Sequence, residues 1–97
     1  MMNINQIFRK WLETGNVEAV RALLHHPYGI DVNYADEDGD TALIKTCVEG
    51  QLELAQLLLE YGADVNVVNQ DRNTALMFAC DKGYVDIVKL LLQHNDG

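Results

Sequence analysis

Apolar residues in the middle of the chain recur at intervals that predict two short helices joined by a glycine. The first segment, residues 42–49, is preceded by Thr41 and followed by Gly50. Threonine suits an N-cap because its side chain accepts a hydrogen bond from an early helix N–H, and glycine ends a helix because it tolerates positive φ. In the second segment, residues 52–60, apolar side chains cover too wide an arc for one buried face. We expect that helix to contact its partner helix and neighbouring structure on both sides.

The same pattern returns after 33 residues. Residues 36–64 laid over residues 69–97 give nine identities in 29 positions. A fixed period with matched apolar positions indicates stacked copies of one supersecondary unit.

A degraded copy precedes these two. Residues 15–24 match residues 50–59 at an offset of 35, whereas residues 29–33 match residues 62–66 at 33. Two residues are therefore inserted near residues 26–28, where a surface connection accepts them at little cost. We expect one domain, residues 1–97, made of units 1–35, 36–68 and 69–97, the first being an N-terminal capping repeat.

The unit resembles the ankyrin repeat, a β-turn followed by two antiparallel helices. The residues that carry the resemblance are Asp36, Gly39, Thr41-Ala42-Leu43, Gly50, Leu57–Leu59 and Gly62–Asn66, then Thr74-Ala75-Leu76, Gly83 and Leu90–Leu92. The resemblance covers nearly the whole chain. It implies an all-α solenoid of stacked helix-turn-helix units joined by β-hairpin-like loops, and a non-catalytic protein-protein interaction module.

Several positions depart from the family pattern. The family's Thr-Pro-Leu-His stands here as Thr-Ala-Leu-Ile at residues 41–44 and Thr-Ala-Leu-Met at residues 74–77. Arg72 replaces a glycine that the family uses where positive φ is preferred, and Asn69 replaces an aspartate. We therefore expect a weaker turn in the third unit.

Length and charge narrow the possible functions. A chain of 97 residues forms one small domain with little room for an enclosed active site. Fifteen acidic and seven basic side chains give a net charge of −8, which disfavours nucleic acid and anionic membranes and favours cationic partners. We expect a cytoplasmic protein, because no segment has the apolar run of a signal peptide or a membrane span.

The acidic stretch Asp36-Glu37-Asp38-Gly39-Asp40 raises the possibility of a calcium loop. An EF-hand that began at Asp36 would need glycine at its sixth position and glutamate at its twelfth, but Thr41 and Cys47 stand there. We therefore interpret the stretch as a solvated turn and expect no metal and no cofactor.

Other conspicuous side chains have structural interpretations. Cys47 and Cys80 occupy equivalent places in successive units, too far apart to bridge, and both are expected to be small buried core residues. Phe8 and Trp11 are expected to pack in the core of the opening helix. The histidines, His25, His26 and His94, are expected to be structural or solvated rather than metal ligands. No phosphate loop, nucleophile elbow or His-Glu-x-x-His pair is present, so we expect no enzyme.

The resemblance implies a partner-binding surface on the concave face, made of hairpin tips and first helices. The contact residues that it implies are Glu37, Asp38, Asp40, Val48, Glu49, Val68, Gln70, Asp71, Asn73, Asp81 and Lys82, with Ala35 beside them and Glu13 and Thr14 as counterparts in the cap. Because this set is strongly acidic, we expect a partner with a basic segment or patch.

Two further hypotheses remain open. The last helix carries apolar residues that face outward without a polar cap, so the chain could self-associate through this end or form part of a longer repeat array. Asn33 and Asn66 also resemble asparagines that are hydroxylated in some ankyrin domains, although bracing of the turn is the preferred interpretation.

Overall fold

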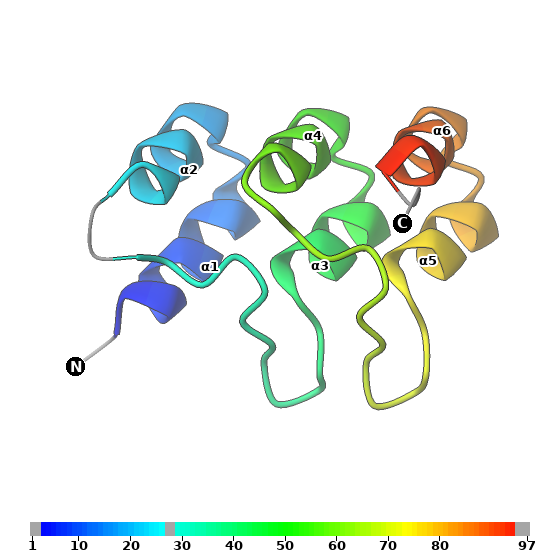
Figure 1. The fold of residues 1–97 in the computed structure, drawn as a ribbon, viewed down its shortest axis with the longest axis horizontal. Helices are drawn as coiled ribbons and strands as arrows, with labels where there is room; N and C mark the ends of the chain where they lie inside the picture. Colours follow the sequence, from blue (N-terminus) through cyan, green and yellow to red (C-terminus); the bar gives the residue numbers. More distant parts are fainter. Residues whose placement is uncertain (1–2, 27–28, 95–97) are drawn as a thin grey trace.

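Three helix pairs stand side by side in the structure, a computed structural model that describes residues 3–26 and 29–94 (Figure 1). The expected units 1–35, 36–68 and 69–97 each enclose one pair, and the two-residue insertion expected near residues 26–28 falls partly outside the described residues. No strand occurs in the described part of the chain. The helices are α1 (Ile4–Thr14), α2 (Val17–Leu24), α3 (Ala42–Glu49), α4 (Leu52–Glu60), α5 (Ala75–Lys82) and α6 (Val85–His94).

The helix boundaries follow the local capping chemistry. Thr41 Oγ1 accepts a hydrogen bond from Ile44 N at 3.2 Å, and Thr74 Oγ1 accepts one from Met77 N at the same distance. Gly50 then ends α3 in the left-handed conformation, with φ at 73°. The helices predicted at residues 42–49 and 52–60 are confirmed as α3 and α4. Thr41 and Gly50 define the bounds of α3 locally. Helix α4 begins after Gln51, which makes no side-chain cap bond, and ends before Tyr61.

The helices form two rows, with α1, α3 and α5 in one and α2, α4 and α6 in the other (Figure 1). Helix α3 packs against α1, α4 and α5, while α4 packs against α2, α3 and α6. The wide apolar arc predicted for residues 52–60 is confirmed, since α4 is covered on all these sides. Its buried side chains are Leu54, Ala55, Leu57, Leu58 and Leu59.

Two loops project from the row of first helices, one before α3 and one before α5 (Figure 1). In the first, Asp36 N donates to Asp40 O, and in the second, Asn69 N donates to Asn73 O, each at 3.0 Å. We call residues 35–40 and 68–73 the tips of the first and second hairpins. The hairpin shape is therefore repeated although much of its sequence is not.

Arg72 adopts the left-handed conformation that its replacement of a glycine implies. Its φ is 65°, beside 81° for Gly39 at the equivalent position, and it is the one described non-glycine residue with positive φ. A Cβ atom makes this region unfavourable, so the second hairpin keeps the family conformation under backbone strain. The structure thus supplies a physical cause for the weaker turn expected in the third unit.

Two expectations about buried side chains are wrong. Cys80 is exposed, whereas Cys47 is fully buried, because the described chain stacks another unit on α3 and α4 but none on α5 and α6. Trp11 is 40% exposed, whereas Phe8 is 1% exposed as expected. Trp11 corresponds to Thr46 and Ala79, which are buried in helices that have a unit before them, whereas no described unit precedes α1.

Candidate functional site: the hairpin face

In each hairpin turn, one side-chain oxygen accepts hydrogen bonds from two backbone N–H groups. Asp36 Oδ1 accepts hydrogen bonds from the N–H groups of Asp38 and Asp40, both at 2.9 Å. Asn69 Oδ1 makes the same two bonds in the second hairpin, to Asp71 N and Asn73 N at 3.0 Å. An amide oxygen accepts as a carboxylate oxygen does, so the change from Asp36 to Asn69 preserves the turn.

The hairpins are also bonded to each other. Asn69 Nδ2 donates to Asp40 Oδ1 at 2.9 Å, and Gln70 donates through its backbone N to Asp38 O at 3.0 Å. The Gln70 side chain donates to Glu37 O at 2.6 Å. These bonds join the two tips into one continuous surface. We call this surface the hairpin face, and we include in it the accessible residues of the first helices that the resemblance implies and the cations beside them: Arg9, Glu13, Thr14, Lys45, Val48, Glu49, Asp81 and Lys82.

Gly39 is required for this close approach. A Cβ atom at this position would lie 3.0 Å from Asn69 Cα and 3.0 Å from Gln70 N, both of which are backbone atoms. Its φ of 81° also disfavours any side chain. The glycine that the sequence supplies therefore serves both the turn and the contact between hairpins.

Two cations of the hairpin face converge on Asp36. Arg9 Nη2 lies 3.0 Å and Lys45 Nζ 3.7 Å from Asp36 Oδ2. Burial would raise the pKa of Asp36, but the N–H groups of Asp40 and Asp38 and the charges of Arg9 and Lys45 outweigh it, so the pKa lies below its usual value. Asp36 is thus an ionised structural residue that ties α1 and α3 to the first hairpin.

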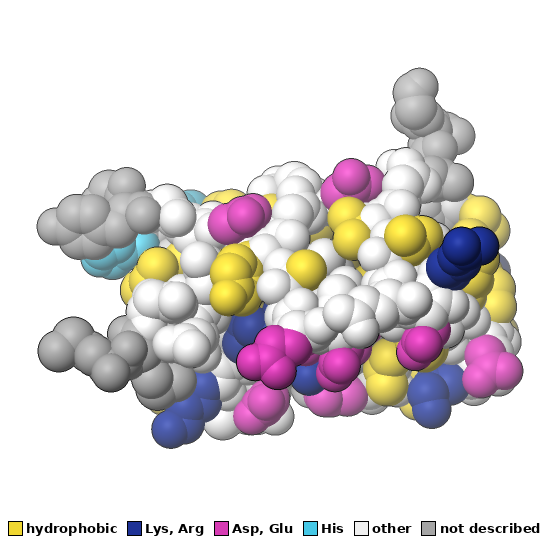
Figure 2. Space-filling model, turned by 90° about the horizontal axis from the view of Figure 1, so that it is seen from below, with side chains coloured by type: hydrophobic (Ala, Val, Ile, Leu, Met, Phe, Trp, Pro, Cys, Tyr) yellow, Lys and Arg dark blue, Asp and Glu magenta, His cyan; other side chains and the backbone are white. Residues whose placement is uncertain are grey.

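The structure leaves every predicted contact residue accessible to some degree. Asp40, Val48 and Asn73 are half-buried, and the others are exposed. Acidic side chains gather over the middle of this face (Figure 2). The exposed members of the set are Glu37, Asp38, Glu49, Val68, Gln70, Asp71, Asp81 and Lys82, with Glu13, Thr14 and Ala35 beside them.

The negative charge is concentrated in the second unit. Residues 36–68 contain eight carboxylates and one lysine, a net charge of −7, while residues 1–35 balance at zero and residues 69–97 sum to −1. The formal charge of −8 is therefore mostly a property of the first hairpin and of the helices that follow it.

Sequence reasoning missed one part of this face. An open groove of about 280 Å³ lies between α1 and the first hairpin, and its walls include Gln6, Arg9 and Tyr34. Tyr34 is 36% exposed beside the carboxylates of Glu37 and Asp38. The signal for it was weak, because α1 lacks the turn motif that identifies the equivalent surface in the other units.

Three carboxylates of the first hairpin lie close enough to consider a metal. One oxygen from each of Asp36, Asp38 and Asp40 falls within 4.8 Å of the others. Both oxygens of Asp36 already accept hydrogen bonds or pair with Arg9 and Lys45, and Asp40 Oδ1 accepts from Asn69. The cluster is accounted for by the turn, so we assign no metal to it.

A family model for ankyrin repeats in three copies matches residues 10–97. The chain belongs to the ankyrin-repeat family. Ankyrin repeats are generally protein-protein interaction modules and generally not enzymes. No described helix is long and apolar enough to cross a membrane.

One curated relative is a longer protein. The ankyrin chain is 38% identical over 58 residues to the acyl-CoA-binding domain-containing protein 6 homolog of Dictyostelium discoideum. The match covers 60% of the ankyrin chain and 20% of that relative, so the chain spans only about a fifth of the relative's length.

The environments of Cys47 and His25 indicate structural roles for both side chains. Burial raises the pKa of the Cys47 thiol to about 12, against an opposing hydrogen bond with Thr46, so the thiol is protonated at neutral pH. His25 Nε2 contacts the hydroxyl of Tyr61, and the rings meet edge-on with centroids 5.2 Å apart. This contact joins the ends of α2 and α4, which is the structural role expected for His25.

Proposed function

We propose that this ankyrin domain binds a basic segment of another protein through the hairpin face. The proposal rests on how the cations of this face are distributed among its carboxylates. Among residues 3–26 and 29–94, both ion pairs end on Asp36, whereas Glu37, Asp38, Glu49 and Asp71 have no cationic partner. A surface of one sign accelerates association with a partner of the opposite sign and rejects partners of the same sign.

The rigidity of the hairpin face supports the same proposal. The bonds of Asn69 and Gln70 to the first hairpin hold both tips in a fixed relation before any partner arrives. A preorganised surface loses little conformational entropy on binding. The carboxylates of Asp38 and Asp71 can then engage two separate cations of one extended segment.

The groove beside α1 gives this surface a place for a particular side chain. Tyr34 offers an exposed aromatic ring, and Glu37 and Asp38 place carboxylates at the same rim. An arginine or lysine is suited to such a setting, because its stem packs on the ring while its charge meets the carboxylates.

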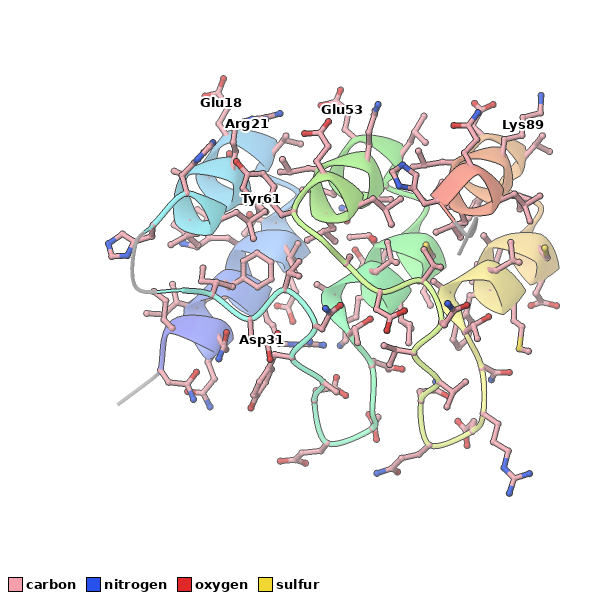
Figure 3. The ribbon with its side chains drawn as sticks, viewed as in Figure 1. Glu18, Arg21, Asp31, Glu53, Tyr61 and Lys89 are labelled. Atoms are coloured by element: carbon pink, nitrogen blue, oxygen red, sulfur yellow. The ribbon has the colours of Figure 1, made fainter. Side chains whose placement is uncertain are left out.

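Matched charge reversals test the proposal. The double variant Asp38→Lys/Asp71→Lys changes equivalent positions of the two hairpins, and the control Glu18→Lys/Glu53→Lys changes equivalent positions of α2 and α4. Glu18 and Glu53 point away from the hairpins (Figure 3). Each pair moves the net charge by the same amount, so the comparison separates local from overall charge. The variant used here spares Asp40, whose carboxylate bonds Asn69.

The probe is a fluorescent nine-residue peptide of alternating arginine and alanine, followed by anisotropy at low and high salt. We expect the hairpin variant to bind about ten-fold more weakly than wild type at low salt, since two attractive charges become repulsive. The control should lose much less. Equal losses in the two variants would refute the hairpin face as the binding surface, and binding insensitive to salt would refute its electrostatic basis.

A further inference from the structure

A small cavity lies between α1 and α3, where the first and second units pack against each other. Its volume of about 10 Å³ is the space that one water-sized group needs. The side chains of Glu13, Glu49 and Gln51 line it, and the first two belong to the hairpin face. The cavity is therefore formed between two described units and opens toward the proposed binding surface.

The amide of Gln51 has an unpaired acceptor. Its Oε1 atom is buried and accepts no hydrogen bond, and it is the one buried side-chain nitrogen or oxygen of residues 3–26 and 29–94 in this condition. The backbone N–H of Gln51 donates to Thr46 O at 3.0 Å, which holds the residue at the end of α3. A buried acceptor costs free energy until a donor reaches it. A ligand that suits this cavity therefore donates a hydrogen bond.

The two helices that form the cavity favour a cation at this place. Glu13 lies in the last turn of α1 and Glu49 ends α3, and neither helix has a basic residue in its last turn. The carboxyl end of a helix carries a partial negative charge, so a cation there is stabilised. Arg9 and Lys45 also line the cavity, but both pair with Asp36. Within the described residues, no ion pair neutralises Glu13 or Glu49.

The equivalent place between α3 and α5 has different residues. Lys82 stands there in place of Glu49, and Tyr84 stands in place of Gln51. The Tyr84 ring lies against Gly50, where an added Cβ atom would be 2.9 Å from Tyr84 Cζ. In this second groove the chain has a cation of its own and a ring in place of the amide. Of the two grooves, only the one between α1 and α3 combines unpaired carboxylates with an unpaired acceptor.

We propose that this cavity receives the ammonium group of one lysine of the basic segment, an inference that rests on the proposed function. An ammonium is compact and has three N–H donors, so it can donate to Gln51 Oε1 while its charge faces the two carboxylates. A guanidinium is planar and larger than one water-sized group. The lysine stem leaves the cavity beside Glu13 and Glu49, which are exposed. The site thus selects lysine over arginine at one position of the segment.

Two peptides of equal length and charge test this selection, one alternating arginine with alanine and the other alternating lysine with alanine. Anisotropy gives the affinity of each peptide for wild type and for Gln51→Met, which nearly keeps the side-chain volume and removes the acceptor. We expect Gln51→Met to bind the lysine peptide about ten-fold more weakly and the arginine peptide as wild type does. Gln56→Met, the same substitution at an exposed position of α4, is the control and should change neither affinity.

Two further measurements separate lysine binding from a purely structural role of Gln51. Gln51→Met should unfold at the same urea concentration as wild type or at a higher one, because it removes an unpaired buried acceptor. The side-chain amide resonances of Gln51 should shift on addition of the lysine peptide and much less with the arginine peptide.

The outcomes distinguish this inference from the proposed function. Unchanged affinity of Gln51→Met for the lysine peptide, or equal losses for both peptides, would overturn the lysine site and leave the cavity to water alone, while the proposed function stands. An unshifted Gln51 amide in the lysine complex would do the same. Failure of both peptides to bind wild type would refute the proposed function, and the lysine site with it.

Discussion

At the scale of single residues, Asn69 shows why the second hairpin has an amide where the first hairpin has the carboxylate of Asp36. Its oxygen holds the second turn as the Asp36 carboxylate holds the first. Its nitrogen donates to Asp40, a bond that a carboxylate cannot make. Arg9 and Lys45 balance the negative charge of Asp36. Asn69 instead bonds the carboxylate of Asp40, which a second carboxylate would repel.

Asn69→Asp is therefore expected to destabilise the fold by about 1–3 kcal/mol at pH 7, because a donor is lost and two carboxylates face each other. The repulsion raises the folded-state pKa of one carboxyl above its unfolded value of about 4, so stability is lost as pH rises through that raised pKa. The deficit should shrink on acidification below about pH 5. Urea unfolding at both pH values measures it.

Asp40→Asn combined with Asn69→Asp is the matched control. The pair exchanges donor and acceptor across the same contact, so the double variant should recover most of the lost stability. Independent, additive costs of the two substitutions would contradict the contact between Asn69 and Asp40.

At the scale of elements, short helices depend on their neighbours. Helices of 8 to 11 residues are marginal in isolation, so packing between pairs supplies most of their stability. The loops add specific bonds between units. Asn33 Oδ1 accepts from Asp64 N at 2.8 Å, and Asn33 Nδ2 donates to Gly62 O at 3.3 Å. Of the two asparagines expected to brace a turn, Asn33 does so in the described structure, and the turn it braces is that of the following unit, whereas no described contact shows this role for Asn66.

Asn66 occupies the same place one unit later and gives a paired prediction. Its side chain is exposed and has no hydrogen-bond partner among the described residues. Asn33→Ala should cost about 1–2 kcal/mol, whereas Asn66→Ala should change stability by less than about 0.5 kcal/mol. Urea denaturation of the two variants measures the difference. Similar costs for both would show that the asparagine acts within its own loop and not across units.

At the scale of the whole molecule, the units of the solenoid differ in net charge and in how many neighbouring units cover them. Within residues 3–26 and 29–94, the acidic second unit lies between two nearly neutral units and packs against both of them. Trp11 is exposed in the first unit, and Met77 and Leu92 are exposed in the third. Both differences become visible only when the units are compared, and neither can be seen in a single unit.

This arrangement predicts where the fold opens first. Amides of α5 and α6 should exchange with deuterium faster than those of α3 and α4, because the third unit has neighbours on one side and a strained residue, Arg72, in its hairpin. Exchange is measured at low protein concentration. Equal protection of both helix pairs would show instead that the solenoid opens as a single cooperative unit.

The sequence by itself determined the period, the helix boundaries around Thr41 and Gly50, and the family. These depend on residue types at fixed spacing, so local sequence specifies them. It also placed the acidic residues of the hairpin face, because they follow from register within the repeat. The surface's role in binding stays a prediction.

Only the tertiary structure decided which of two equivalent residues is covered. Cys47 and Cys80 occupy the same position of the repeat, yet one is buried and the other exposed. The pairing of Arg9 with Asp36 and of Asn69 with Asp40 likewise joins residues 27 and 29 positions apart. Burial and such pairing depend on which unit is stacked alongside, and that information is not contained in the local sequence of either residue.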